Sequence, residues 1–251
     1  MNLLAFDTST EMMSVAVSRC ADAANQTNQV WQLTAPGGAQ TSAHLIPVIQ
    51  RLMAQAGLQF GQLDAIVFGN GPGSFTGLRT ACSVAQGLAF GANVQVLPVD
   101  TLLAVAEEAR FQHAVGLDTF SVLALLDARM DEMYAGHYLF HSGRWTKNGR
   151  CSLILPEDLV FDAACALAGN VFAVYGPRLP EPALTASEPA SLAIGLAPRI
   201  HALPTATALL RLAPALLAAG AAVRADQALP LYIRDKVAKT TLERAAEKAA
   251  L

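Results

Sequence analysis

The stretch that decides the fold is Gly69-Asn70-Gly71-Pro72-Gly73-Ser74-Phe75-Thr76-Gly77-Leu78-Arg79. It follows an apolar segment, residues 65–68, that favours a strand, and it leads into a run of small residues, 76–90, that favours a helix. A strand, a glycine loop and a helix N-terminus bind phosphates in other proteins. A Walker A loop would end in Gly-Lys-Ser/Thr, and a dinucleotide loop would need glycine at Ser74 or Thr76, so neither motif is present. The stretch therefore indicates a particular architecture more than phosphate transfer.

The opening of the chain is echoed near its middle. Residues 3–7 form an apolar run that ends in Asp7, and residues 123–127 form a matching run that ends in Asp127. In both places a short polar turn and a further strand follow, with Met13 and Met133 at the same offset from the aspartate. Repetition of a unit is a signal at the level of the fold. The sequence therefore predicts two related halves.

Hydrophobic periodicity predicts alternating strands and helices along the rest of the chain. A helix over residues 41–56 carries an i, i+3, i+4, i+7 apolar stripe and is stopped by Gly57. The other predictions are strands at 12–18, 30–34, 94–99, 132–141 and 229–233, helices at 101–110 and 204–222, a long loop at 176–198, and a charged tail helix at 239–251.

Composition bounds the class of protein. With 251 residues, 53% of them hydrophobic, the chain can form one large domain or two smaller ones. A net charge of −3 argues against a protein that binds nucleic acid on its own. The N-terminus lacks the basic region of a signal peptide, and the most apolar stretch, 208–223, is too short to span a bilayer. Four cysteines lack metal-finger spacing, so we expect reduced thiols in a soluble, cytoplasmic protein with no membrane contact.

Metal ligation and nucleophilic catalysis find little support in the residue pattern. His137 and His141 have the spacing of a helical zinc pair, but their segment favours a strand, where they would lie roughly 13 Å apart. Ser74 lacks the second glycine of a G-x-S-x-G nucleophile turn, because that position is Thr76. Cys82 is expected to be a packed thiol. We therefore predict neither a metal site nor a catalytic residue.

The aspartates at the two turns are the best polar candidates. Acidic turns at the mouths of duplicated units can hold a metal-nucleotide between them. An aspartate that closes its own turn with backbone hydrogen bonds explains Asp7 and Asp127 equally well. The sequence leaves both interpretations open.

Taken together, the segments resemble the TsaB (YeaZ) family, the dimerisation subunits of bacterial tRNA threonylcarbamoyladenosine synthesis. The matching stretches cover nearly the whole chain, and they are Leu4-Ala5-Phe6-Asp7-Thr8-Ser9-Thr10, the glycine stretch 69–79, Leu126-Asp127-Ala128-Arg129-Met130 and Pro230-Leu231-Tyr232-Ile233-Arg234. The resemblance implies an α/β fold like that of actin and sugar kinases, with two tandem ribonuclease-H-like domains of mixed sheets flanked by helices. We place these domains at 1–112, with the dimerisation helices, and at 113–251.

The resemblance also implies a role without catalysis. TsaB is similar to its partner TsaD, which transfers a threonylcarbamoyl group to the adenosine beside the tRNA anticodon and carries a metal-binding His-x-x-x-His after the strand that follows the glycine loop. At the corresponding place this chain has Thr101 and Val105, neither of which replaces a neutral imidazole. We therefore expect a subunit without metal or cofactor that meets tRNA only in the complex with a TsaD-like transferase and a TsaE-like ATPase.

Two other functions come from different classes. A glycoprotease-like metallopeptidase would need metal ligands and an activated water, for which we find no residue set. A small-substrate kinase of the actin-like fold would need phosphate loops richer in glycine and a catalytic base. For the chain as it stands we expect at most a remnant nucleotide cleft, with weak or no ATP binding, and its residues are Asp7, Thr8, Ser9, Thr10, Gly71, Gly73, Ser74 and Asp127.

The expected partner surface lies on the two N-terminal helices, which in this resemblance pack against equivalent helices of TsaD. Its residues are Leu45, Val48, Ile49, Leu52, Met53, Leu78, Ala81 and Ala85. Because this surface resembles that of TsaD, the isolated chain is expected to form a homodimer through it. Ile49→Asp is then predicted to abolish pairing without unfolding the protein.

Overall fold

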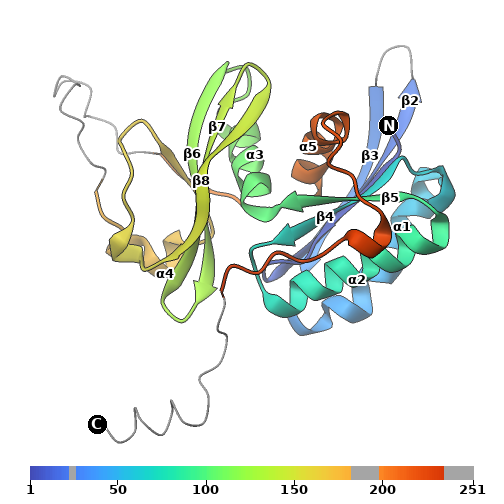
Figure 1. Ribbon diagram of the computed structural model, residues 1–251, viewed down its shortest axis with the longest axis horizontal. Helices are drawn as coiled ribbons and strands as arrows, with labels where there is room; N and C mark the ends of the chain where they lie inside the picture. The colour runs from blue at the N-terminus through green and yellow to red at the C-terminus, as the bar shows by residue number, and fades with distance from the viewer. Residues whose placement is uncertain (23–26, 182–197, 235–251) are drawn as a thin grey trace, which may run out of the picture.

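The computed structural model describes residues 1–22, 27–181 and 198–234, which form two halves around two five-stranded sheets (Figure 1). The strand order of the first sheet is β3-β2-β1-β4-β5. Its strands are β1 (Leu3–Asp7), β2 (Met12–Asp22), β3 (Thr27–Pro36), β4 (Ala65–Gly71) and β5 (Gln95–Asp100). β1 pairs antiparallel with β2 and parallel with β4, so the sheet is mixed.

The second sheet repeats this topology in the order β10-β9-β6-β7-β8. Its strands are β6 (Thr119–Arg129), β7 (Glu132–His141), β8 (Arg144–Ile154), β9 (Ala166–Gly169) and β10 (Arg199–His201). β6 takes the central place of β1, because it pairs antiparallel with β7 and parallel with β9. The two runs that end in Asp7 and Asp127 are therefore equivalent strands, and the internal repeat is confirmed.

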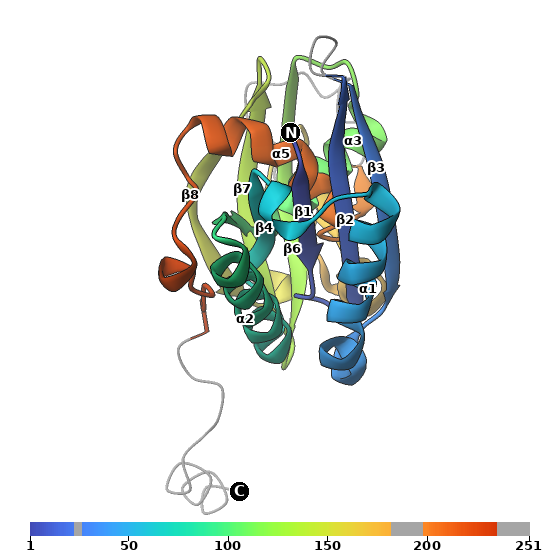
Figure 2. The same cartoon turned by 90° about the vertical axis from the view of Figure 1, so that its right-hand side faces the viewer.

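The helices cover the sheets in layers, as Figures 1 and 2 show. They are α1 (Thr41–Ala56), α2 (Phe75–Ala92), α3 (Thr101–His113), α4 (Phe172–Tyr175) and α5 (Ala206–Ala218), with short 3₁₀ turns at Gly38–Gln40, Phe60–Gln62, Pro156–Asp158, Gly176–Arg178 and Ala225–Gln227. α1 and α2 lie side by side on one face of the first sheet, and α3 and α5 lie between the two sheets. In the described chain, no helix is both long enough and apolar enough to cross a membrane.

The alternation of side chains along β1 explains why helices are needed on both faces of the first sheet. Leu4 and Phe6 point into the core beneath α1 and α2, whereas Leu3 and Ala5 point into the core beneath α5. All four are 2% exposed or less. A central strand that is apolar on both faces requires cover on both.

The apolar stripe of α1 faces the protein's own core. Leu45, Ile49, Leu52 and Met53 are 0–3% exposed and pack with the first sheet, and Val48 packs against the same cluster. On α2, Leu78, Ala81 and Ala85 are buried as well. The prediction of a partner surface is therefore corrected for the seven buried side chains, because side chains packed inside this protein are not available to a partner. For Val48, which is half-buried, it stays a prediction.

Several boundaries differ from the predictions. The strand predicted at 229–233 is absent, because that segment makes isolated contacts with the glycine loop and does not join a sheet ladder. The predicted helix at 204–222 is shorter, and the strands β8, β9 and β10 were not predicted. The tail helix at 239–251 and most of the loop at 176–198 lie outside the described residues.

The domain division at residue 112 stays a prediction. The strands of the two sheets respect it, but α5 from the second part of the chain packs against β1 and β2 of the first. α3 from the first part packs against β6 of the second. The two halves therefore exchange helices across the predicted boundary.

Candidate functional site

The glycines of the deciding stretch let other parts of the same chain approach closely. A Cβ at Gly77 would collide with the carbonyl oxygen of Thr8, and one at Gly73 would lie 2.6 Å from the carbonyl oxygen of Ser9. A Cβ at Gly69 would collide with the Asp7 carboxylate. The loop therefore packs on the turn that follows β1, and these glycines are explained without a phosphate.

Gly71 has a different neighbour, the C-terminal strap, which we define as residues 228–234. Its φ of +120° is a conformation that side chains other than that of glycine rarely adopt, and a Cβ there would collide with the carbonyl oxygen of Leu231. The strap is joined to the loop by a 2.6 Å hydrogen bond from the Leu231 N–H to the carbonyl oxygen of Asn70. The glycine loop thus contacts segments near both ends of the sequence, the turn after β1 and the strap.

Asp7 is sealed beneath this loop. Its Oδ1 accepts hydrogen bonds from the N–H and the hydroxyl of Ser9, at 2.9 and 2.7 Å. Its Oδ2 is buried and has no hydrogen-bond partner among the described residues. Burial raises the pKa of Asp7 to about 6, against the lowering effect of the Ser9 hydrogen bonds. Asp7 is 1% exposed, so its carboxylate does not face solvent. Its hydrogen bonds with Ser9 close the turn that follows β1.

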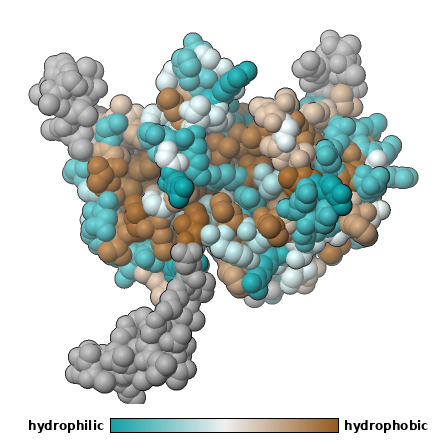
Figure 3. Space-filling model, viewed as in Figure 1, coloured by the Kyte–Doolittle hydropathy of each residue, from teal (hydrophilic) through white to brown (hydrophobic). Residues whose placement is uncertain are grey.

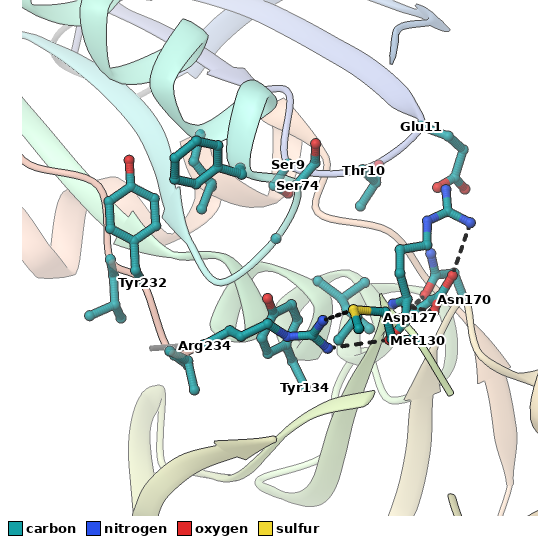
Figure 4. Close-up of a pocket in the computed structure, with 18 of the residues that line it drawn as sticks. Ser9, Thr10, Glu11, Ser74, Asp127, Met130, Tyr134, Asn170, Tyr232 and Arg234 are labelled. Atoms are coloured by element: carbon teal, nitrogen blue, oxygen red, sulfur yellow. Dashed lines mark hydrogen bonds and ion pairs between the residues drawn. The ribbon is translucent and has the colours of Figure 1, made fainter. Parts of the chain in front are cut away.

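A cavity of about 680 Å³ lies between the two halves, next to the glycine loop (Figure 4). In Figure 4 the hydroxyls of Ser9, Thr10 and Ser74 face Tyr134 and Arg234 across the open space. Apolar side chains also contribute to its wall, and they are Phe75, Leu78, Leu126, Ala128, Met130, Leu231 and Ile233. The cavity is therefore amphipathic, with hydroxyls from the first half and a cation from the strap.

Asp127 belongs to the cavity but is fully engaged. Its Oδ1 accepts the Arg129 N–H at 2.8 Å and the Tyr175 hydroxyl at 2.9 Å, and its Oδ2 forms an ion pair with Arg129 at 3.2 Å. Its own N–H donates to Asn170 Oδ1. Burial together with the bond to Asp127 raises the pKa of Tyr175 to about 12. These contacts favour the interpretation in which the aspartate closes its own turn.

The cavity brings together five of the residues predicted for a remnant nucleotide cleft: Ser9, Thr10, Gly73, Ser74 and Asp127. For Asp7, Thr8 and Gly71 the prediction is corrected. Thr8 is 2% exposed and its hydroxyl donates to the Gly77 carbonyl oxygen at 2.7 Å, while Asp7 and Gly71 make the internal contacts described above. Nucleotide binding by the cavity itself stays a prediction.

Sequence reasoning missed the strap as part of the site. Tyr232 stacks on Phe75 with ring centroids 5.2 Å apart, and its hydroxyl accepts a 3.0 Å hydrogen bond from Arg79 Nε. The Arg79 guanidinium lies 3.8 Å from the centroid of Phe75. Arg234 bonds to Glu132 at the turn between β6 and β7. The signal was present, because Arg79 and residues 230–234 lay in the family stretches, but contacts between them cannot be predicted from spacing.

The strap also accounts for exposed apolar surface. Figure 3 shows hydrophobic residues gathered around the point where the described chain ends. Leu229 and Leu231 of the strap are 69% and 42% exposed, and Met130, which contacts Arg234, is 68% exposed. The strap thus joins both halves while it leaves apolar side chains on the surface.

The residues do not fit the metal site that the resemblance places after β5. Thr101 is fully buried and its hydroxyl accepts a 3.0 Å hydrogen bond from the Gly71 N–H, and Val105 is packed in the core between α3 and the second sheet. The pair on β7 is also used otherwise, since His137 contacts Ser121 and Asn148, and His141 contacts Thr119. Within residues 1–22, 27–181 and 198–234, no group of three or more His, Cys, Asp or Glu could hold a metal ion.

Two mixed sheets of the same topology, flanked by exchanged helices around a central cavity, define the fold class as that of actin and sugar kinases, built from two ribonuclease-H-like halves. A family model described as "TsaD: tRNA N6-adenosine threonylcarbamoyltransferase" matches residues 25–242. The chain belongs to this family and, within it, to the TsaB (YeaZ) branch of tRNA threonylcarbamoyladenosine biosynthesis proteins.

Three relatives support this assignment. The TsaB protein of Escherichia coli is 31% identical over 238 residues, which are 95% of this chain and 96% of that protein. The TsaB protein of Haemophilus influenzae is 41% identical over 134 residues, about half of each chain (53% and 52%). The solved structure of YeaZ from Pseudomonas aeruginosa superimposes with a TM-score of 0.73 at 36% identity, and the match covers 92% of this chain and 99% of that one.

Proposed function

We propose that the chain acts in tRNA threonylcarbamoyladenosine biosynthesis as a non-catalytic subunit that pairs with a TsaD-like transferase. The observation that carries the proposal is the environment of Thr101 and Val105. One side chain anchors the glycine loop and the other fills the core, so neither position can hold a catalytic metal. Asp7 and Asp127 are also poorly placed to act as general bases, because Asp7 is buried beneath the glycine loop and Asp127 is held by Arg129 and Tyr175.

The partner surface in this proposal is the outward side of α1 and α2. Their inward sides form the core, but Ile46 on α1 is 41% exposed and Phe90 on α2 is 83% exposed. A Cβ at Gly87 or Gly91 would meet no atom within 4 Å, so α2 presents a slim outer face. Slim helix faces allow close helix packing, and exposed apolar side chains supply the buried centre that an interface needs.

The same face would serve a homodimer when the transferase is absent, because a chain similar to its partner can pair with itself by a two-fold axis. The nucleotide work belongs in this proposal to a TsaE-like ATPase. The glycines that could cradle a phosphate are closed by Thr8, Ser9 and Leu231, which supports that division of labour.

The test compares two surface variants with one control. Ile46→Asp would place a charge in the interface. Gly87→Gln would add a bulky side chain to the slim face, and it should stabilise the helix itself by up to about 1 kcal/mol because glutamine has the higher helix propensity. Both are expected to retain a native circular dichroism spectrum and to reduce affinity for the transferase at least tenfold. Val160→Asp, which changes a side chain that is 82% exposed far from both helices, should change neither.

A transfer assay tests the absence of catalysis. The purified chain alone should transfer no threonylcarbamoyl group to tRNA, whereas the chain together with the transferase and the ATPase should. Transfer by the chain alone would contradict the proposal. Undiminished pairing of both surface variants would instead place the interface elsewhere.

A further inference from the structure

The outward face of the second sheet carries a patch of polar side chains that the proposed function does not use. Along β8, Trp145 and Lys147 point inward, since they contact Glu107 on α3 and Asp100 at the end of β5. Alternation then turns Arg144, Thr146 and Asn148 outward. Asn148 confirms this direction by its contact with His137 on β7.

These side chains form rows across three strands. In the register of the sheet, Thr119, His141 and Arg144 lie opposite one another, and the Thr119 hydroxyl contacts His141 Nδ1 at 3.3 Å. A second row is diagonal, because Ser121 stands opposite Leu139 in the register, and it joins Ser121, His137 and Asn148 through contacts of 2.9 and 3.2 Å. We call the six residues of these rows the histidine face. Apart from Ser121 and His137, which are half-buried, its side chains are exposed.

The strand segments that carry the face contain no carboxylate side chain, and Asp118 adjoins the face beside Thr119 at its edge. Residues 119–126 and 133–154 contain no Asp or Glu. The nearest acidic residues along the chain are Asp118 just before β6, Asp127 near the end of β6 and Glu132 at the start of β7. Arg144 is exposed, as is Arg150 farther along β8, and among the described residues neither forms an ion pair. In a chain of net charge −3, this is a local excess of positive charge.

Only part of the sheet is covered on this side. Leu123, Leu125 and Met133 pack under Tyr175 of α4 and Leu159, in a separate apolar cluster. At the other end of the strands, where β7 turns into β8, no element among residues 1–22, 27–181 and 198–234 covers this side, and Figure 3 shows hydrophilic residues at this upper end of the second sheet. In the described part of the chain, the histidine face is thus an exposed polar surface next to a covered apolar one.

We propose that the histidine face docks the phosphate backbone of tRNA. This inference rests on the proposed function, which makes tRNA the substrate of the complex. Phosphate oxygens take hydrogen bonds from arginine, hydroxyl and amide groups, which are the groups gathered here, and RNA bases stack on histidine rings. An acidic protein partner fits less well, because Leu139 at 37% exposure is the large apolar side chain in the middle of these rows and a protein interface needs a larger apolar centre.

The experiment measures tRNA affinity by filter binding, at a series of salt concentrations, for the full chain alone and for its complex with the transferase. Arg144→Glu is compared with Arg224→Glu, which reverses another exposed charge, one that is paired with Asp226 and lies outside this sheet. We expect Arg144→Glu to weaken tRNA binding about tenfold at about 50 mM salt. The plot of log association constant against log salt concentration should become less steep, its slope falling in magnitude by about one. Arg150→Glu should act in the same direction, and Arg224→Glu should have no comparable effect.

Complex formation is measured in parallel by size-exclusion chromatography. The inference is overturned if neither the free chain nor its complex with the transferase binds tRNA. It is also overturned if Arg144→Glu leaves tRNA affinity and its salt dependence unchanged in the form that does bind. Loss of complex formation by Arg144→Glu with unchanged tRNA affinity of the free chain would also overturn it, in favour of a protein partner. Failure of the unaltered chain to join the transferase would contradict the proposed function, and the free-chain arm would still decide the inference.

Discussion

The N–H of Leu231 donates a 2.6 Å hydrogen bond to the carbonyl oxygen of Asn70, at the place where Gly71 leaves no room for a side chain. One contact thus joins the strap to the glycine loop, and the same strap reaches Glu132 in the second half through Arg234. The relationship makes Gly71 the residue on which the position of the strap depends.

We therefore predict that Gly71→Ala destabilises the protein by about 1–3 kcal/mol, because the φ of +120° strains alanine and its Cβ displaces Leu231. Urea unfolding measures the change, and hydrogen exchange should show the loss of protection at Leu231. Gly87→Ala is the matched control, since its Cβ meets open space in a helix and should be neutral or stabilising by up to about 1 kcal/mol. Equal stability of the two variants would contradict the role of Gly71.

Ile49 tests the correction made on α1. Because its side chain is fully buried in the core between α1 and the first sheet, Ile49→Ala should cost about 2–5 kcal/mol of unfolding free energy. Ile46→Ala, on the outward side of the same helix, should change it by less than about 0.5 kcal/mol. Thermal or urea unfolding decides between them, and comparable losses at both positions would be inconsistent with the packing of α1.

The pH dependence of stability follows from Asp7. Its pKa is raised from 3.8 to about 6 on folding, so the native state holds the proton more tightly than the unfolded chain. This contribution is fully present below about pH 4 and is lost as the pH rises through about 6, and two pK units correspond to about 3 kcal/mol. Asp7→Asn cannot titrate, so its stability relative to the unaltered protein should rise over that interval. Parallel curves of urea midpoint against pH would show that Asp7 does not titrate in this way.

A second buried carboxylate acts in the opposite sense. Burial raises the pKa of Glu107, but hydrogen bonds from Arg110 and Trp145 and the charges of Arg110 and Arg211 lower it overall. Its stabilising effect is present above the ordinary glutamate pKa and is lost as the pH falls through the lowered value. Since Arg211 belongs to α5, Glu107→Gln should loosen α5 and cost roughly 3 kcal/mol.

The exposed pair Arg224–Asp226 provides the control for Glu107, because both of its side chains are more than 60% exposed. Removing it by Arg224→Ala should cost less than about 1 kcal/mol. Urea unfolding measures both variants, and proteolysis should detect the release of α5 only in Glu107→Gln. A cost for Glu107→Gln no larger than that for Arg224→Ala would contradict the inference that Glu107 holds α5 in place through Arg211.

The sequence predicts those parts of the fold whose signals are local. The helix at 41–56 was predicted with its observed bounds, because Gly57 adopts the left-handed conformation that ends it. The strand at 132–141 was also predicted with its observed bounds. β8 was missed, because an edge strand with one solvated side carries the polar run Arg144–Arg150 and no clear alternation.

The site was harder to predict for a physical reason. A hydrophobic stripe such as that of Leu45 and Ile49 indicates that a helix face is buried, but it does not identify the surface that buries it. A stripe that packs in the protein's own core therefore has the same sequence pattern as one that packs against a partner. Residues 229–233 have the apolar content of a strand, yet their backbone contacts are made with a loop. The meeting of Tyr232 with Phe75 depends on long-range packing that no local pattern records.

The exchange of elements between the two halves has a consequence for how the protein is made. The face of the first sheet formed by Leu3, Ala5 and Val67 is covered by α5, and the glycine loop is closed by the strap. Translation supplies the first sheet long before either of them. A chain still on the ribosome therefore carries an uncovered apolar sheet face until α5 has emerged, and its glycine loop stays open until the strap has followed.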